Sequence, residues 1–381
     1  MMQERLARYE TILNQLERKG RRRKLFAQSG KDFTSNDYLG LVGSQRLRAS
    51  VISAIERGVP VGAGGSRLLR GNHPEHEMLE EEAATFFGSE RMLYFGSGYA
   101  ANLAVLSTLP QRNDLIIYDE LIHASAHAGI AAGRGRAASV SHNDLEATED
   151  VIRKWRQADG KGHPWIVVES LYSMDGDKAP LSGLMDLADR YDGFLFVDEA
   201  HATGVHGMDG RGFAAELEGR DNVIVLHTCG KALGVEGALV GGSGVLCDYL
   251  INHARPFIYA TAPSPLAAAV VREALKILYD EPERRRKLHS MITYANDQIL
   301  SHFGREGSGS QILPVILGDN ARTLRIAQQM QADGFDLRAI RPPTVPTNTV
   351  RLRISVTLNV ELSTVSRIFD RLATVIAEAQ L

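Results

Sequence analysis

The stretch VIVLHTCGKALGVEGALVGG, residues 223–242, decides how the rest of the chain is interpreted. It begins with an apolar run of strand length, passes through a polar turn and ends in small residues suited to close packing. Lys231 stands in the turn between Gly230 and Ala232. A single lysine is most often a solvated surface charge. Among small and apolar neighbours, however, a lysine can lose its proton and act as a nucleophile toward carbonyl groups.

Length, charge and cysteine content exclude several classes of protein. With 381 residues, the chain exceeds the usual size of one hydrophobic core. Its net charge of −3 argues against nucleic-acid partners and against polybasic membrane binding. Cys229 and Cys247 lack metal-ligand spacing and are too few for a disulfide framework, which favours a reducing compartment. Because we find neither a signal-peptide core nor a bilayer-length apolar run, we expect a cytoplasmic protein without metal.

Apolar strands alternate with helices through the middle of the chain. Strands are predicted at residues 165–169, 193–197 and 223–226, with helices at 145–158 and 184–191. This alternation is typical of an α/β fold with a mostly parallel sheet covered on both faces. Ligands bind at the carboxyl ends of such strands, and polar residues occur there in each case. They are Glu169 and Ser173, then Asp198 and His201, then Thr228 and Lys231.

A change of composition after Pro256 indicates a second, smaller domain. We predict an N-terminal helix and substrate-contact segment at residues 1–45, a large domain at 46–258 and a C-terminal α+β domain at 259–381. In residues 350–356, apolar side chains alternate with Arg351 and Arg353. The arginine face is either solvated or built for carboxylate recognition.

The turn at residues 96–101 has two interpretations. A predicted strand at 91–95 runs into GSGYAA, where small residues precede a helix N-terminus that can bind phosphate. The same residues match G-x-G-x-x-A, and Asp119 ends the next predicted strand, as in a nicotinamide-binding Rossmann unit. The motif alone does not separate a pyridoxal-phosphate enzyme from an NAD-dependent dehydrogenase.

Asp198, His201 and Lys231 together match the needs of pyridoxal phosphate. An acid at the end of a buried strand needs a cationic partner, which a protonated pyridine nitrogen supplies. His201 could bond the phenolic oxygen of the ring, and Lys231 the aldehyde. The Gly98–Tyr99 turn and Thr228 would bind the phosphate. His123 is a candidate for ring stacking, although a histidine there is commonly structural.

Nine segments resemble the α-oxoamine synthases, which are fold-type I pyridoxal-phosphate enzymes. They are SNDYLGL, GAGGSR, FGSGYAAN, HAS, SMDGD with APL, VDEAHATGV, TCGKALG, RPFIYAT, and IRPPTVP with RLRIS, spanning residues 35–355. The IRPPTVP loop and the run Arg21–Arg23 favour the 8-amino-7-oxononanoate branch. The resemblance implies a large domain with a seven-stranded-type sheet, a smaller C-terminal domain, and a homodimer with its active site at the subunit interface.

The resemblance also implies roles for individual residues. Catalytic roles fall on Lys231, as the Schiff-base lysine, and on His123, Asp198 and His201. The cofactor would further contact Gly98, Tyr99, Ser173 and Thr228, with Thr261 reaching the partner subunit's phosphate. Arg353 would hold the amino-acid carboxylate, Arg21 and Thr344 would meet the acyl substrate, and Asn36 and Glu169 would line the site.

The implied reaction is a decarboxylative condensation of L-alanine with a pimeloyl thioester, carried by CoA or a carrier protein, to 8-amino-7-oxononanoate in biotin biosynthesis. Other members of the family remain alternatives: glycine C-acetyltransferase, aminolevulinate synthase, serine palmitoyltransferase and signal-molecule synthases. The dehydrogenase alternative leaves Asp198, His201 and Lys231 unexplained.

Overall fold

The structure is a computed structural model that describes residues 2–379, with side chains from residue 5 onward. The chain divides into two compact units. The large unit comprises Asn36–Ser173 and Asp177–His289. The small unit comprises the residues up to Ser35, Met174–Gly176 and the residues from Ser290 onward. The three-part division predicted from the sequence, at 45/46 and 258/259, stays a prediction.

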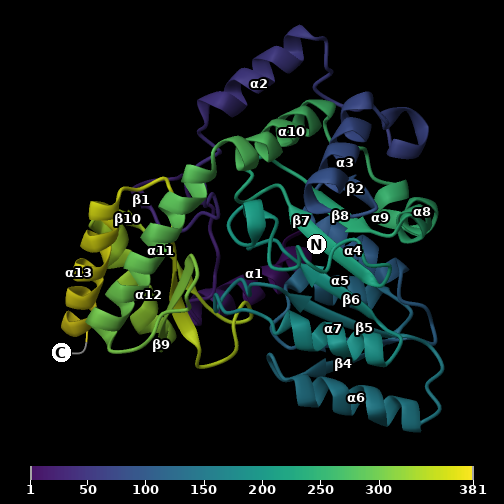
Figure 1. Ribbon diagram of the computed structural model, residues 1–381. Coiled ribbons are helices and arrows are strands. Elements are labelled where there is room, and N and C mark those ends of the chain that lie inside the picture. The colour runs from purple at the N-terminus through teal and green to yellow at the C-terminus, as the bar shows by residue number, and fades with distance from the viewer. Residues whose placement is uncertain (1, 380–381) are drawn as a thin grey trace. The chain divides into compact units, whose positions relative to one another are not determined.

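A seven-stranded sheet organises the large unit (Figure 1). Five neighbouring strands run parallel, and β8 lies antiparallel between β2 and β7. The predicted α/β class with a mostly parallel sheet is therefore confirmed. In spatial order the strands are β2 (Arg91–Phe95), β8 (Ala238–Gly242), β7 (Val223–Thr228), β6 (Phe194–Asp198), β5 (Pro164–Glu169), β3 (Leu115–Asp119) and β4 (Arg136–Val140).

Helices cover both faces of this sheet. Successive strand residues point to opposite sides, so the apolar strands have two apolar faces and each face needs a cover. Ile116 of β3 packs into one hydrophobic cluster and Ile117 into the other. The first cluster is closed by α4 (Gly98–Thr108), α5 (Ala124–Ala132), α8 (Gly244–His253) and α9 (Arg255–Ile258). The second is closed by α6 (Leu145–Gln157) and α7 (Leu181–Arg190). Three further helices pack together beside β2: α2 (Gln45–Glu56), α3 (Pro74–Phe87) and α10 (Pro265–Asp280).

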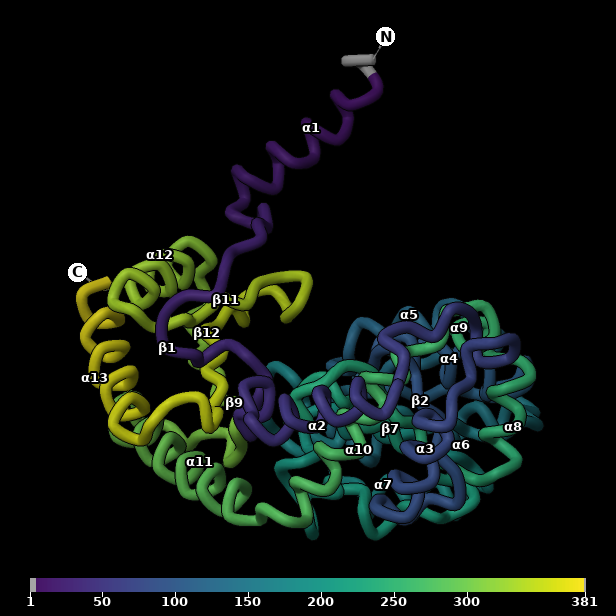
Figure 2. Tube along the Cα trace, turned by 90° about the horizontal axis from the view of Figure 1, so that it is seen from above, coloured from purple at the N-terminus to yellow at the C-terminus, as the bar shows by residue number. Residues whose placement is uncertain are grey.

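The small unit is an α+β layer. Its antiparallel sheet has the order β11-β12-β9 and packs against α12, which in turn lies beside α13 (Figure 2). These elements are β9 (Ile312–Gly318), α12 (Asn320–Ala332), β11 (Ala339–Ile340), β12 (Val350–Ser355) and α13 (Leu362–Glu378). The unit also contains α1 (Met2–Arg18) and the parallel pair β1 (Lys31–Asp32) and β10 (Phe335–Asp336). The helix α11 (Pro282–Phe303) begins in the large unit and ends in the small one.

Both faces of β12 are buried, so the interpretation of a solvated arginine face is wrong. Arg351 is 2% exposed and forms an ion pair with Asp175 within the small unit. Arg353 is 7% exposed, and one of its guanidinium nitrogens donates to Ser355 Oγ at 2.7 Å. Hydrogen bonds and an ion pair therefore offset the cost of burying these two charges.

Candidate active site

The carboxyl ends of three adjacent strands meet in the large unit. Glu169 at the end of β5 pairs in register with Asp198 at the end of β6. Asp198 in turn pairs with Leu226 of β7, which leads through Thr228 into the turn that carries Lys231. The parallel pairing of these strands brings their ends together at one edge of the sheet, as predicted.

A chain of short contacts links Lys231 to the start of the large unit. Lys231 Nζ lies 2.8 Å from His201 Nε2, and His201 Nδ1 lies 2.6 Å from the Tyr38 hydroxyl. That hydroxyl donates to Asn36 Oδ1 at 3.0 Å, an oxygen that can only accept. The imidazole of His201 therefore lies between the Tyr38 hydroxyl and the Lys231 amine, with one ring nitrogen facing each.

Asp198 is held by neutral donors. Asn102 Nδ2 donates to Asp198 Oδ2 at 2.8 Å, and the backbone N–H of Ala200 donates to Oδ1 at 2.9 Å. Asn102 itself is 1% exposed and also bonds Ser125 Oγ at 2.9 Å. The carboxylate of Asp198 is 7% exposed and accepts these hydrogen bonds from neutral groups. A cation bound beside it would therefore stabilise its negative charge.

His123 caps the N-terminus of α5. Its Nδ1 accepts from the backbone N–H of Ser125 and lies 2.7 Å from Ser125 Oγ. Burial lowers the pKa of His123, and the positive charge of Lys231 lowers it further, while Asp198 raises it. The lowered pKa favours the neutral imidazole near pH 7, and the predicted stacking of His123 on the cofactor stays a prediction.

The glycine turn leads into the N-terminus of α4, where we predict that a phosphate binds. Ser97 caps α4 by accepting from Ala100 N, so the first N–H groups of α4 point to the end of the helix. Gly98 lies beside Thr228, since a Cβ added at Gly98 would be 3.5 Å from Thr228 Oγ1. Tyr99 is half exposed beside it.

Ser173 contacts a residue of this site, whereas Thr261 lies in an exposed loop. Ser173 is buried, and its backbone N–H donates to Glu169 Oε2 at 3.1 Å. Thr261 is exposed in the loop between α9 and α10, next to Ala262, whose N–H bonds Gly65 O in the glycine-rich loop. The exposure of Thr261 is compatible with the predicted contact to a partner subunit.

Three of the predicted substrate residues lie in the small unit: Arg21, Thr344 and Arg353. Arg21 and Thr344 line one cavity of about 260 Å³, together with Arg23 and Arg341. Arg23 donates to Thr344 Oγ1 at 3.2 Å. Burial and the neighbouring charges of Arg23 and Arg21 lower the pKa of Arg341, which marks the cavity as strongly cationic. Arg353 is on β12, and its predicted role stays a prediction.

The Rossmann alternative is wrong. The G-x-G-x-x-A turn follows β2, an edge strand that pairs antiparallel with β8 and does not neighbour β3. Asp119, the proposed ribose acid, binds His142 Nδ1 at 2.9 Å, while His142 Nε2 binds Asp177 at 2.6 Å. Burial alone would lower the pKa of His142, but these two carboxylates raise it to about 10. Asp119 is thus occupied within the protein by an imidazolium.

Sequence reasoning missed Asn102 and Tyr38 as site residues. Both lie in quoted motifs, FGSGYAAN and SNDYLGL, and the motifs were the available signal. Their partners are 96 and 163 positions away in sequence, so spacing could not reveal the contacts.

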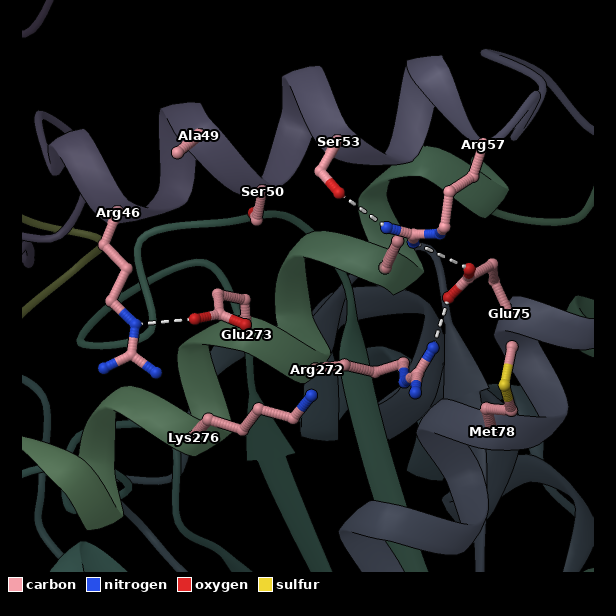
Figure 3. Close-up of a pocket in the computed structure, with 11 residues that line it drawn as sticks. Arg46, Ala49, Ser50, Ser53, Arg57, Glu75, Met78, Arg272, Glu273 and Lys276 are labelled. Carbon is pink, nitrogen blue, oxygen red and sulfur yellow. Dashed lines mark hydrogen bonds and ion pairs between the residues drawn. The ribbon is translucent and has the colours of Figure 1, made fainter.

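A larger cavity of about 590 Å³, between α2, α3 and α10, does not have the features of an active site (Figure 3). Its arginines are paired with acids: Arg46 with Glu273 at 2.6 Å, and Arg272 with Glu75 at 2.6 Å. Because these charges are neutralised locally, the cavity is lined by a structural ion-pair network. Among residues 2–379 we also find no cluster of three or more potential metal ligands and no helix that could cross a membrane.

The residues of the large unit fit pyridoxal phosphate. The turn at Gly98 and the α4 N-terminus suit a phosphate, and the neutral-anchored Asp198 suits a ring cation. A half-buried amine, Lys231, stands beside them for the aldehyde.

Comparisons with known proteins agree with this site. The pattern of the family "Aminotransferase class I and II" matches residues 30–372. The chain is 41% identical to the 8-amino-7-oxononanoate synthase of Chromobacterium violaceum, over 89% of this chain and 87% of the relative. It is 39% identical to 8-amino-7-oxononanoate synthase 2 of Bacillus subtilis, over 85% and 82%.

Solved structures give the same result. The 8-amino-7-oxononanoate synthase of Francisella tularensis superposes with a TM-score of 0.78 at 28% identity, covering 93% of this chain and 99% of that one. The serine palmitoyltransferase of Sphingomonas wittichii superposes at 0.85 with 26% identity, covering 91% and 87%. A structure of SPT with a PLP internal aldimine does so at 0.85 with 25% identity, covering 91% and 87%. The chain therefore belongs to the aminotransferase class I and II family and, within it, to the 8-amino-7-oxononanoate synthases.

Proposed function

We propose that this chain is a pyridoxal-phosphate-dependent acyltransferase. It condenses L-alanine with a pimeloyl thioester to give 8-amino-7-oxononanoate, carbon dioxide and the free thiol, a step of biotin biosynthesis. The observation that carries the proposal is the convergence of Lys231, His201 and Asp198 at adjacent strand ends. The 41% identity to a synthase of this name supports the choice of reaction.

The bound cofactor supplies an aldehyde for amines and a ring that withdraws electrons from the substrate's α-carbon. Asp198, fixed by Asn102, holds the positive charge of the ring nitrogen. Lys231 would be the amine that holds the cofactor, and the same side chain would serve as the base for the α-proton of alanine. His201, whose orientation is set by the Tyr38 hydroxyl at 2.6 Å, keeps a polar contact beside that amine. His123 covers the ring and excludes water.

We assign substrate contacts to Asn36 of the large unit and to Arg21, Thr344 and Arg353 of the small unit. Arg353 would bind the carboxylate of alanine by a charge-assisted hydrogen bond. The cationic cavity of Arg21, Arg23 and Arg341, with Thr344 at its rim, would bind the anionic acyl substrate. Either CoA or a carrier protein could deliver the thioester to these residues.

A homodimer with its active site at the subunit interface is part of the proposal. Large apolar side chains of the large unit are exposed on and around α2: Val42, Ile52, Ile55, Val61 and Leu69. We infer that these side chains belong to an association surface, since contiguous exposed apolar surface marks such sites. A second copy would cover them and could place its own groups near the exposed Thr261. A cytoplasmic location stays a prediction.

The test is a substrate panel. Alanine, glycine and serine are each combined with pimeloyl, acetyl, succinyl and palmitoyl thioesters, and free thiol is measured together with the amino-ketone product. We expect turnover with alanine and pimeloyl thioester, and none in Lys231→Ala. Turnover only with glycine or serine and another thioester would replace this assignment by one of the alternatives within the family.

A further inference from the structure

Glu169 is an acid in the site whose two oxygens have different surroundings. It ends β5 and pairs in register with Asp198 on the parallel neighbour β6, so both side chains point to the same face, with strands about 5 Å apart. Glu169 is 3% exposed and Asp198 is 7% exposed. Two carboxylates so close and so buried do not both ionise readily, because each charge disfavours the other.

The hydrogen bonds indicate which of the two keeps a proton. Both oxygens of Asp198 accept from amide donors, as a carboxylate requires. Glu169 Oε2 accepts from the backbone N–H of Ser173 at 3.1 Å. Glu169 Oε1 is fully buried and has no hydrogen-bond partner among the described residues. The two oxygens therefore differ, and a proton on Oε1 would make this oxygen a donor that has no acceptor among the described residues.

The electrostatic surroundings agree. Burial raises the pKa of Glu169 to about 8, with a further contribution from Asp198, against the lowering effects of Lys231 and of backbone N–H groups. The titratable groups that act on Glu169 are Asp198 on β6 and Lys231 after β7, and Glu169 in turn acts on Tyr172 of its own loop. The backbone N–H groups of Ser173 and His123 lower the pKa of Glu169. The raised pKa favours the protonated acid near neutral pH.

We propose that Glu169 works as a neutral acid whose Oε1 hydroxyl donates a hydrogen bond to an oxygen of the bound cofactor or of the amino-acid substrate. The inference rests on the proposed function, since it needs a bound acceptor in this site. A buried donor without a partner costs free energy, and a ligand oxygen that accepts its proton removes that cost. Ionisation of Glu169 replaces the donor by a second negative charge beside Asp198, so it weakens binding.

The experiment uses apoprotein of the full chain and compares Glu169→Gln with Glu169→Leu. Glutamine keeps one acceptor and one donor in nearly the same shape but cannot ionise, whereas leucine has neither. Glu199→Gln is the matched control, because Glu199 is another buried acid of raised pKa, about 7, but is partnered by Ser170 Oγ and Ala214 N. The dissociation constant of pyridoxal phosphate is measured by absorbance from pH 6.5 to 9.5, and that of L-alanine is then measured on the loaded protein.

We expect Glu169→Gln to bind like the wild type below pH 7. Above about pH 8, the wild-type dissociation constant should rise relative to that of Glu169→Gln by up to about tenfold per pH unit. Glu169→Leu should bind more weakly than Glu169→Gln throughout, and Glu199→Gln should keep the wild-type profile. If the effect is in cofactor binding, the acceptor is on the cofactor. If it occurs only with alanine, the acceptor is the amino-acid carboxylate.

A ratio of wild type to Glu169→Gln that stays constant over the whole pH range would overturn the inference, as would equal binding by the glutamine and leucine variants. Loss of the wild-type profile in Glu199→Gln would overturn it as well. Failure of the proposed function is a different result, because wild-type apoprotein would then bind no pyridoxal phosphate at any pH. Circular dichroism of each variant identifies any that does not fold. If Glu169→Leu does not fold, comparison of the Glu169→Gln and Glu199→Gln profiles with the wild-type profile still decides the outcome.

Discussion

Replacement of Asn102 by alanine tests how Asp198 is held. The amide of Asn102 donates to Asp198 Oδ2 at 2.8 Å and lies behind it with 1% of its surface exposed. A hydrogen bond to a charged group contributes about 1.5 to 3 kcal/mol. If all of this free energy is used to orient Asp198 toward the ring cation, Asn102→Ala weakens cofactor binding roughly 10- to 150-fold. This range is an upper limit, because Asp198 keeps the N–H of Ala200.

The assay is a titration of apoprotein with pyridoxal phosphate, followed by visible absorbance, with thermal unfolding of the apoprotein measured alongside. Asn252→Ala is the control, since Asn252 is exposed on α8 and its amide donates only to a backbone oxygen, that of Asp248. It should leave the dissociation constant unchanged. A folded Asn102→Ala protein that binds the cofactor within twofold of wild type would refute the role we assign to Asn102.

Three further variants probe other contacts. Tyr38→Phe removes the hydroxyl that orients His201 and should lower kcat about tenfold, the equivalent of one hydrogen bond, with little change in apoprotein stability; an unchanged kcat would contradict this. His142, with its pKa raised to about 10, contributes stability that is fully present below pH 6.5 and is lost as pH rises through about 10. The difference in unfolding free energy between wild type and His142→Gln should therefore shrink from neutral to alkaline pH, and a constant difference would argue against an imidazolium. Arg351→Met breaks the ion pair between buried Arg351 and partly exposed Asp175 and should cost about 1.5 to 3 kcal/mol in denaturant unfolding; a loss below about 0.5 kcal/mol would show that the pair is dispensable.

Much of the fold could be predicted because central strands of a parallel sheet are apolar on both faces. β5 and β7 are buried along their whole length, and their sequences are nearly continuous apolar runs. The strands β4 and β8 were not predicted. β4 is an edge strand, and four of its five residues are exposed or half-exposed. β8 consists of small residues, which the pattern indicated only as a closely packed segment.

The site could be predicted where its residues follow strand ends, and not where they depend on distant partners. Asp198, His201 and Lys231 follow two neighbouring strands, so their convergence was implied by the topology. Asn102 lies on α4 and touches the site only through the tertiary fold. Arg351 alternates with apolar residues as an exposed side chain does, but an ion pair with a residue 176 positions away allows its burial.

The most direct test of the account is the visible spectrum of the purified protein with pyridoxal phosphate. If Lys231 anchors the cofactor, the wild type is yellow, its band changes when L-alanine is added, and reduction by borohydride fixes the cofactor on the peptide that contains Lys231. Lys231→Ala should lack the band of the lysine-bound cofactor and should release no thiol from pimeloyl thioester. A wild-type protein that shows no band after addition of the cofactor, or a Lys231→Ala protein that keeps the wild-type band and turnover, would contradict the central claim.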